Sequence, residues 1–76
     1  MGLDHISIRR REVLKKVRDA AQAASLPFEV TEFTNHTGVT VGSHRSTIGR
    51  HSDVDNTTAR KFFKQFEEVL GEGWWK

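Results

Sequence analysis

The chain has 76 residues, of which 36% are hydrophobic, and a formal net charge of +2. This length suffices for one domain with one modest core, and no apolar run approaches the ~18 residues that suggest a membrane-spanning helix. There is no cysteine, and the four histidines fit no familiar zinc spacing, so we expect no disulfide, metal or other cofactor. Because Arg9, Arg10 and Arg11 fall where the apolar stretch of an export signal would lie, we expect a cytoplasmic protein.

A helix is predicted over residues 7–25, with Ser7 as its N-cap. Its apolar residues recur at helical spacing and form one stripe; they are Val13, Leu14, Val17, Ala21 and Ala24. Pro27 ends the pattern, because proline disfavours helical backbone in the residue before it. The segment carries six basic and two acidic residues, so Lys15 and Lys16 are candidates for phosphate contacts. The alternative is an ordinary solvated helix face.

Three strands are predicted next, over residues 28–31, 39–41 and 46–50, because apolar and polar residues alternate there. Asn35 and Gly38 favour a turn or an irregular strand start, and residues 42–45 form the expected hairpin loop. A last helix begins near Asp55 or Asn56, both good N-caps. Its strong apolar stripe consists of Ala59, Phe62, Phe63, Phe66, Val69 and Leu70, and Gly71 is the expected C-cap.

This order of elements predicts a single α+β domain over residues 1–76, with a core at about 7–70 and a short tail at 71–76. A three-stranded antiparallel sheet with both helices on one face buries both stripes and leaves the other face open. The resulting α-β-β-β-α arrangement is similar to that of double-stranded-RNA-binding domains.

Strand parity indicates where the histidines lie. Successive strand residues point to opposite faces, so Val39, Val41 and Ile48 should face the helices, and His36 and His51 should share the open face. Two hairpin registers preserve that parity. A two-residue turn at residues 43–44 places the two histidines directly opposite each other, and a turn at 44–45 makes them diagonal neighbours.

Two nearby imidazoles on a basic domain favour RNA cleavage. One imidazole can accept the proton of the 2′-hydroxyl, which then attacks the adjacent phosphorus, and an acid protonates the leaving 5′-oxygen. Histidine suits both roles, because its pKa of about 6.5 supplies both protonation states near neutral pH. The alternative is that His36 and His51 are ordinary surface residues.

The sequence also resembles HicA-type toxins, the small mRNA interferases of bacterial and phage HicA–HicB toxin–antitoxin modules. The resemblance rests on short motifs spread over nearly the whole chain, namely Phe28-Glu29, Thr34-Asn35-His36, Thr47-Ile48-Gly49-Arg50-His51 and residues 57–65. It implies an endoribonuclease that needs no metal and is neutralised by a HicB-like antitoxin, with His36 as the catalytic residue. Gly49 replaces the family's proline, and Thr34 and Asn35 replace its glycine and serine. The literal Gly42-Ser43-His44 makes His44 the fallback catalytic residue.

Further cations are candidates for RNA contacts. Arg45 lies at the predicted hairpin tip, where a loop can grip a phosphate, and Arg50 ends the third strand. Arg60 and Lys61 begin the last helix, where free backbone amides favour an anion. Each of these residues has an ordinary exposed role as its alternative.

The tail contains Trp74 and Trp75 on a short glycine tether. Tryptophan is a favoured interface anchor, so the pair is a candidate partner-binding site, with an antitoxin as the natural partner. The alternative is that both indoles fold back onto the core. Two other functions stay open beside the ribonuclease, a non-catalytic RNA-binding module and a small phage protein that binds a host protein.

Overall fold

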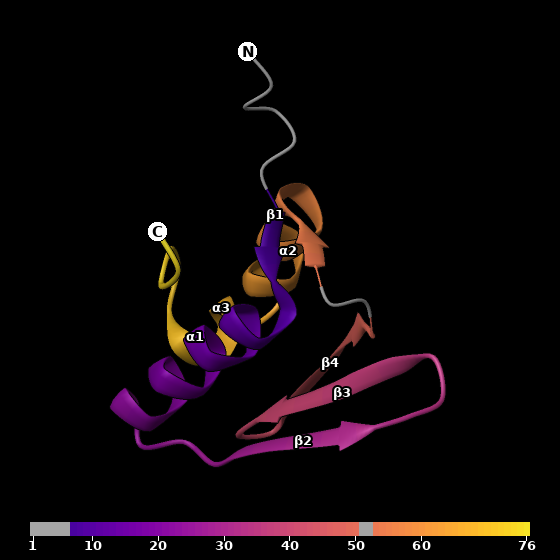
Figure 1. The fold of residues 1–76 in the computed structure, drawn as a ribbon. Helices are drawn as coiled ribbons and strands as arrows, with labels where there is room; N and C mark the ends of the chain where they lie inside the picture. The colour runs from indigo at the N-terminus through magenta and orange to yellow at the C-terminus, as the bar shows by residue number, and fades with distance from the viewer. Residues whose placement is uncertain (1–6, 51–52) are drawn as a thin grey trace.

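Two main helices lie on one face of a three-stranded antiparallel sheet in the computed structural model, which describes residues 7–50 and 53–76 (Figure 1). The elements in chain order are β1 (Ser7–Arg9), α1 (Arg10–Ala23), β2 (Phe28–Glu32), β3 (His36–Val41), β4 (His44–Gly49), β5 (Asp53–Asp55), α2 (Asn56–Lys64) and α3 (Glu67–Leu70). None of the described helices is long and apolar enough to cross a membrane.

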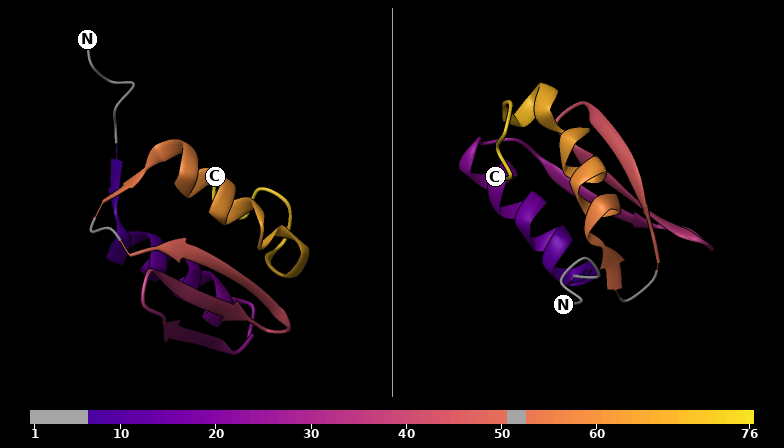
Figure 2. Two further views of the ribbon diagram at one scale, coloured as in Figure 1. Left: turned by 90° about the vertical axis from the view of Figure 1, so that its right-hand side faces the viewer. Right: turned by 90° about the horizontal axis from the view of Figure 1, so that it is seen from above.

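The sheet has the order β2-β3-β4, and the predicted parity is confirmed for the described residues of β3 and β4. Val39, Val41 and Ile48 are buried toward the helices, whereas His36 and Thr47 are exposed on the other face. The helices contribute the rest of one continuous core, which includes Val13, Val17, Ala21, Ala59, Phe62, Phe63 and Phe66. The α+β class and the placement of both helices on one face are therefore as predicted (Figure 2).

The start of the first helix differs from the prediction. Residues 7–9 form β1, which pairs antiparallel with β5, and Ser7 lies opposite Asp55 instead of capping a helix. The pairing sets Ile8 beside the buried Val54, so the alternation of polar, apolar and polar residues here belongs to a strand. The helix itself begins at Arg10 and ends two residues before the predicted boundary.

The hairpin between β3 and β4 turns at Gly42 and Ser43, because Val41 pairs with His44. Both predicted registers are therefore wrong, and the residue opposite His36 is Gly49. Gly42 has a φ of 60°, a left-handed conformation that two-residue hairpin turns require and glycine adopts readily. The shift from each predicted register is an even number of residues, so His36 stays on the open face.

The second helix begins as predicted. The Asp55 carboxylate accepts hydrogen bonds from the backbone N–H groups of Thr57, at 3.0 Å, and Thr58, at 3.3 Å. The predicted stripe is divided between two helices, because α2 ends at Lys64 and α3 follows at Glu67. Gly71 ends α3 with a φ of 101°, as expected of a C-cap glycine.

Candidate functional site

The open face of the sheet consists of three rows of side chains that run across the strands. The registers of β2 with β3 and of β3 with β4 define these rows. From one end of the sheet to the other, the rows are Glu29–Thr40–Arg45, Thr31–Gly38–Thr47 and Phe33–His36–Gly49. The last row lies at the turn between β2 and β3. Gly38 and Gly49 contribute no side chains to this face, and of the two only Gly49 is exposed.

Phe33 accompanies His36 at the turn between β2 and β3. The two ring centroids lie 4.9 Å apart, and the Phe33 N–H donates to the His36 carbonyl at 2.8 Å. The Phe33 side chain is 40% exposed, and it lies over Gly38, where an added Cβ would come within 2.9 Å of the ring. Phe33 thus forms a partly exposed aromatic platform beside the imidazole.

Sequence reasoning did not identify Phe33 as part of a site. The available signal was Gly38, a glycine inside a strand that has β-branched neighbours. Such a glycine often marks a close approach by another group, and here that group is an aromatic ring.

A polar network holds this turn from the helix side of the sheet. An Arg10 guanidinium N–H donates to Glu32 Oε2 at 2.7 Å and also to the hydroxyl oxygen of Thr37. The buried Thr37 hydroxyl donates to Glu32 Oε1 at 2.7 Å. Arg50 completes the network through an ion pair with Glu32 at 3.3 Å and a hydrogen bond to the Phe33 carbonyl at 3.0 Å.

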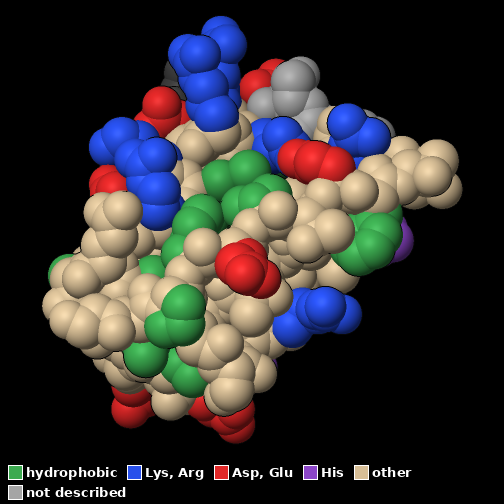
Figure 3. Space-filling model, turned by 90° about the horizontal axis from the view of Figure 1, so that it is seen from below, with side chains coloured by type: hydrophobic (Ala, Val, Ile, Leu, Met, Phe, Trp, Pro, Cys, Tyr) green, Lys and Arg blue, Asp and Glu red, His purple; other side chains and the backbone are tan. Residues whose placement is uncertain are grey.

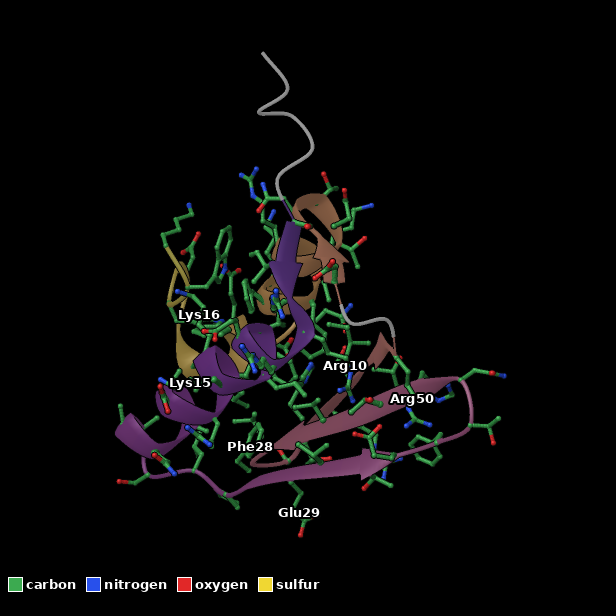
Figure 4. All side chains as sticks on the ribbon, in the orientation of Figure 1. Arg10, Lys15, Lys16, Phe28, Glu29 and Arg50 are labelled. Carbon is green, nitrogen blue, oxygen red and sulfur yellow. The ribbon has the colours of Figure 1, made fainter. Side chains whose placement is uncertain are left out.

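The electrostatics of the network follow from these contacts. The Thr37 hydroxyl and then the Arg10 guanidinium lower the pKa of Glu32 below its usual value of 4.5. Arg50, predicted as an RNA contact and labelled in Figure 4, is held here by Glu32 and the Phe33 carbonyl. Its cationic group therefore fixes the turn that carries Phe33 and His36, and its role toward RNA stays a prediction.

His44 does not join His36 on the open face of the sheet. His44 begins β4 with its side chain toward the helices, where its ring lies 5.5 Å from that of Phe66. Its Nδ1 is 3.8 Å from Glu68 Oε1. His51, predicted as the partner of His36, lies outside the described residues.

The predicted RNA-contacting cations do not form one cluster in the described structure. Arg45 is exposed on the open face, in line with Thr40. The helix cations lie elsewhere: Lys15 pairs with Asp19 at 3.2 Å, and Lys16 lies 6.0 Å from the centroid of the Phe63 ring. Figure 4 labels both lysines on α1.

On α2, Arg60 lies 5.9 Å from the Trp75 ring, and Lys61 is exposed. These two residues and the α1 lysines therefore occupy the helical layer, whereas His36 and Arg45 occupy the sheet face.

The tail packs back onto the helices. The Trp74 indole N–H donates to the Phe63 carbonyl at 2.9 Å, and the Trp75 indole N–H donates to Glu67 Oε2 at 3.1 Å. Both indoles contact the Phe63 ring, at centroid distances of 5.4 and 6.1 Å. The alternative in which the tail folds back is therefore confirmed, and a partner-binding role for the half-buried tryptophans stays a prediction.

Comparisons with known proteins identify no relative, since no family model, curated protein or solved structure matches the chain. Within residues 7–50 and 53–76, no group of three or more His, Cys, Asp or Glu side chains could hold a metal ion. The arrangement that remains is an exposed imidazole beside an exposed aromatic ring, on a sheet face with few bulky side chains.

Proposed function

We propose that the chain is a HicA-like, metal-independent endoribonuclease that uses His36 as its general base and Phe33 to bind a base of the RNA. The observation that carries this proposal is the juxtaposition of the two exposed rings, 4.9 Å apart. Aromatic side chains on sheet surfaces stack with unpaired bases, and a neutral imidazole accepts a proton from a hydroxyl near neutral pH.

In the proposed reaction, a neutral His36 imidazole accepts the proton of a ribose 2′-hydroxyl. The 2′-oxygen forms a bond to the adjacent phosphorus, and the bond from phosphorus to the 5′-oxygen breaks. The products are a 2′,3′-cyclic phosphate and a 5′-hydroxyl, whose proton comes from a general acid or from water. His51 is the candidate acid from the sequence.

The surroundings of His36 support access by RNA. Gly49 lies opposite it in β4, so no side chain from that position covers the imidazole. Arg45 provides a cation on the same face of the sheet, where it can neutralise a phosphate of a bound strand. A HicB-like antitoxin that covers this face would prevent RNA from reaching His36.

A non-catalytic RNA-binding module is the second candidate function. The register favours it, because the residue opposite His36 is Gly49 and no second titratable side chain pairs with the imidazole at that position. The α+β arrangement, with two helices on one face of a three-stranded sheet, and the exposed cations suit either function. Cleavage separates the two, since only the ribonuclease needs the imidazole.

The test is cleavage of single-stranded RNA by the purified protein in EDTA, with His36→Ala compared with wild type. We expect the variant to lose activity by about 100-fold or more, the usual minimum for loss of a general base. Thr47→Ala is a matched control on the same exposed face. An RNA with a 2′-deoxy residue at the cleavage position should remain uncut, because the attacking hydroxyl is missing.

Three results would contradict this assignment. Equal cleavage by wild type and folded His36→Ala would remove His36 from the mechanism, and loss of activity in His44→Gln alone would transfer the role to the fallback histidine. Salt-sensitive RNA binding by wild type without any cleavage would favour the binding module.

Phe33→Leu should weaken RNA binding by about tenfold, since stacking on an aromatic ring contributes about 1–3 kcal/mol.

A further inference from the structure

A groove runs between α1 and the outer strand β2, away from the open face. We propose that it binds an extended acidic segment of a partner protein, which pairs with β2 as an additional strand. The proposal concerns a different surface from the His36 site and does not depend on RNA cleavage.

The groove combines an apolar floor with a cationic rim. Leu14, Phe28 and Val30 form the floor, and the basic residues at the rim all come from one side of α1; they are Arg11, Lys15 and Arg18. The groove has a volume of about 470 Å³, and Val30 is 40% exposed within it. Figure 3 shows hydrophobic side chains gathered on this face with Lys and Arg side chains along one border.

The outer edge of β2 has no partner strand in the described sheet, whose order is β2-β3-β4. An exposed edge offers backbone donors and acceptors to an incoming strand. Because side chains alternate between faces, every second residue of a strand paired with β2 would point into the groove beneath α1.

The alternation of hydrogen bonds between β2 and β3 shows which backbone groups of β2 are available to a further strand. The Phe33 N–H donates to the His36 carbonyl, and the Gly42 N–H donates to the Pro27 carbonyl. The odd-numbered residues on the β2 side therefore make the backbone hydrogen bonds to β3. In an antiparallel pair, the intervening residues direct both backbone groups away from the partner. Phe28, Val30 and Glu32 therefore direct their N–H and C=O groups toward the free edge.

These two features coincide along the same strand. Phe28 and Val30 have side chains in the groove floor and backbone groups directed toward the free edge. An incoming strand can thus form backbone hydrogen bonds and bury apolar side chains at once, which is the usual basis of peptide recognition by strand addition.

The rim selects for acidic residues. Lys15 and Arg18 already bind a carboxylate, that of Asp19, at 3.2 and 3.4 Å, and Arg11 adds a third cation to the same border. Glu12 is the acidic residue of the groove lining. A peptide fits better than RNA, because a nucleic acid backbone has no alternating N–H and C=O groups to pair with the strand edge.

The probe is a fluorescently labelled, end-capped peptide, Thr-Val-Thr-Glu-Thr-Val-Thr-Glu-Thr, titrated with the full chain by fluorescence anisotropy. Its Val and Glu residues occupy one face of an extended strand, and threonine occupies the other. We expect saturable binding that weakens by about tenfold when lysine replaces glutamate. Methylation of alternate backbone nitrogens should weaken it by a similar factor of about ten, because those N–H groups can no longer pair.

Variants of the chain test the same contacts. The double variant Arg11→Glu/Arg18→Glu should weaken binding by about tenfold or more through charge repulsion. Val30→Pro removes an edge N–H that β3 does not use, so it should weaken peptide binding and leave the sheet formed. Arg45→Glu, a charge reversal on the open face, is the matched control and should change the affinity by less than about twofold.

Several outcomes would overturn the proposal. These are the absence of saturable binding by wild type, equal affinity for the glutamate and lysine peptides, and equal affinity for the N-methylated peptide. Displacement of the peptide by single-stranded RNA but not by excess unlabelled peptide would assign the groove to nucleic acid. Circular dichroism checks that each variant is folded. If a variant does not fold, the comparison of the three peptides on wild type still tests the proposed strand addition.

Discussion

At the scale of single residues, Glu32 connects distant parts of the chain. Its carboxylate binds Arg10 at the start of α1, the buried Thr37 of β3, and Arg50 after β4. These contacts hold the turn that carries Phe33 and His36 against the helical layer. The Glu32 side chain is 46% exposed, so solvent screens its interactions. The protonation of its carboxylate can therefore be measured directly.

We predict that Glu32→Gln lowers stability at neutral pH and removes part of its pH dependence. Folding lowers the pKa of Glu32, chiefly through the Thr37 hydroxyl and then Arg10. A lowered pKa in the folded state means that the ionised form stabilises the fold. This contribution is complete above the usual pKa of 4.5 and is lost as the pH falls through the lowered value.

The measurement is urea unfolding of wild type and Glu32→Gln between pH 7 and pH 3. The difference between their midpoints should be largest at neutral pH and should shrink in acid. Glu29→Gln, an exposed change in the same strand, is the control and should leave the midpoint nearly unchanged. A difference between wild type and Glu32→Gln that stays constant over this range would show that ionisation of Glu32 does not stabilise the fold.

At the scale of elements, Asp55 has two roles. It ends β5, where it pairs with Ser7, and its carboxylate caps α2 through the N–H groups of Thr57 and Thr58. We predict that Asp55→Ala lowers the free energy of unfolding by about 1 kcal/mol, the usual cost of losing an N-cap side chain. Urea denaturation measures this change.

Two matched variants isolate the cap from the strand. Asp55→Asn keeps an oxygen that can accept the same hydrogen bonds, so it should retain most of the stability. Asp53→Ala removes an exposed carboxylate from the same strand that does not cap the helix and should have a smaller effect. Equal losses in Asp53→Ala and Asp55→Ala would assign the effect to β5 instead of the helix cap.

The elements that sequence reasoning predicted are those with a strong local signal. The apolar stripes of α1 and α2, the Asp55 cap and the alternation around Val39 each depend on neighbouring residues. The hairpin register depends on the turn, and several turns were compatible with the same alternation. The turn at Gly42 and Ser43 places Gly49 opposite His36 and leaves His36 on the predicted face.

Other features depend on pairing between distant segments, and a single sequence gives little sign of them. β1 forms because residues 7–9 meet β5 more than 40 positions later, and the position of Phe33 depends on a glycine across the hairpin. The network around Glu32 joins four segments. The candidate site was therefore predicted in part, as a histidine on the correct face without its aromatic neighbour.

At the scale of the whole molecule, the tail belongs to the same packed unit as the sheet and helices. Phe63 contacts both tail indoles and is itself part of the core, as is Phe66 beneath the sheet. Trp74 and Trp75 are the only tryptophans in the sequence. Their fluorescence therefore reports on the tail, whereas far-ultraviolet circular dichroism reports on the helices and strands.

We predict that both signals follow one cooperative urea transition with a common midpoint, as small single domains usually do. Phe66→Leu should shift both midpoints equally and lower the free energy of unfolding by about 1 kcal/mol, because it loses the edge contact with Phe62 while keeping an apolar side chain. An earlier fluorescence transition would instead mean that the tail separates before the core unfolds. In that case Phe66→Leu would shift the circular dichroism midpoint more than the fluorescence midpoint, and the tryptophans would become available to a partner while the domain stays folded.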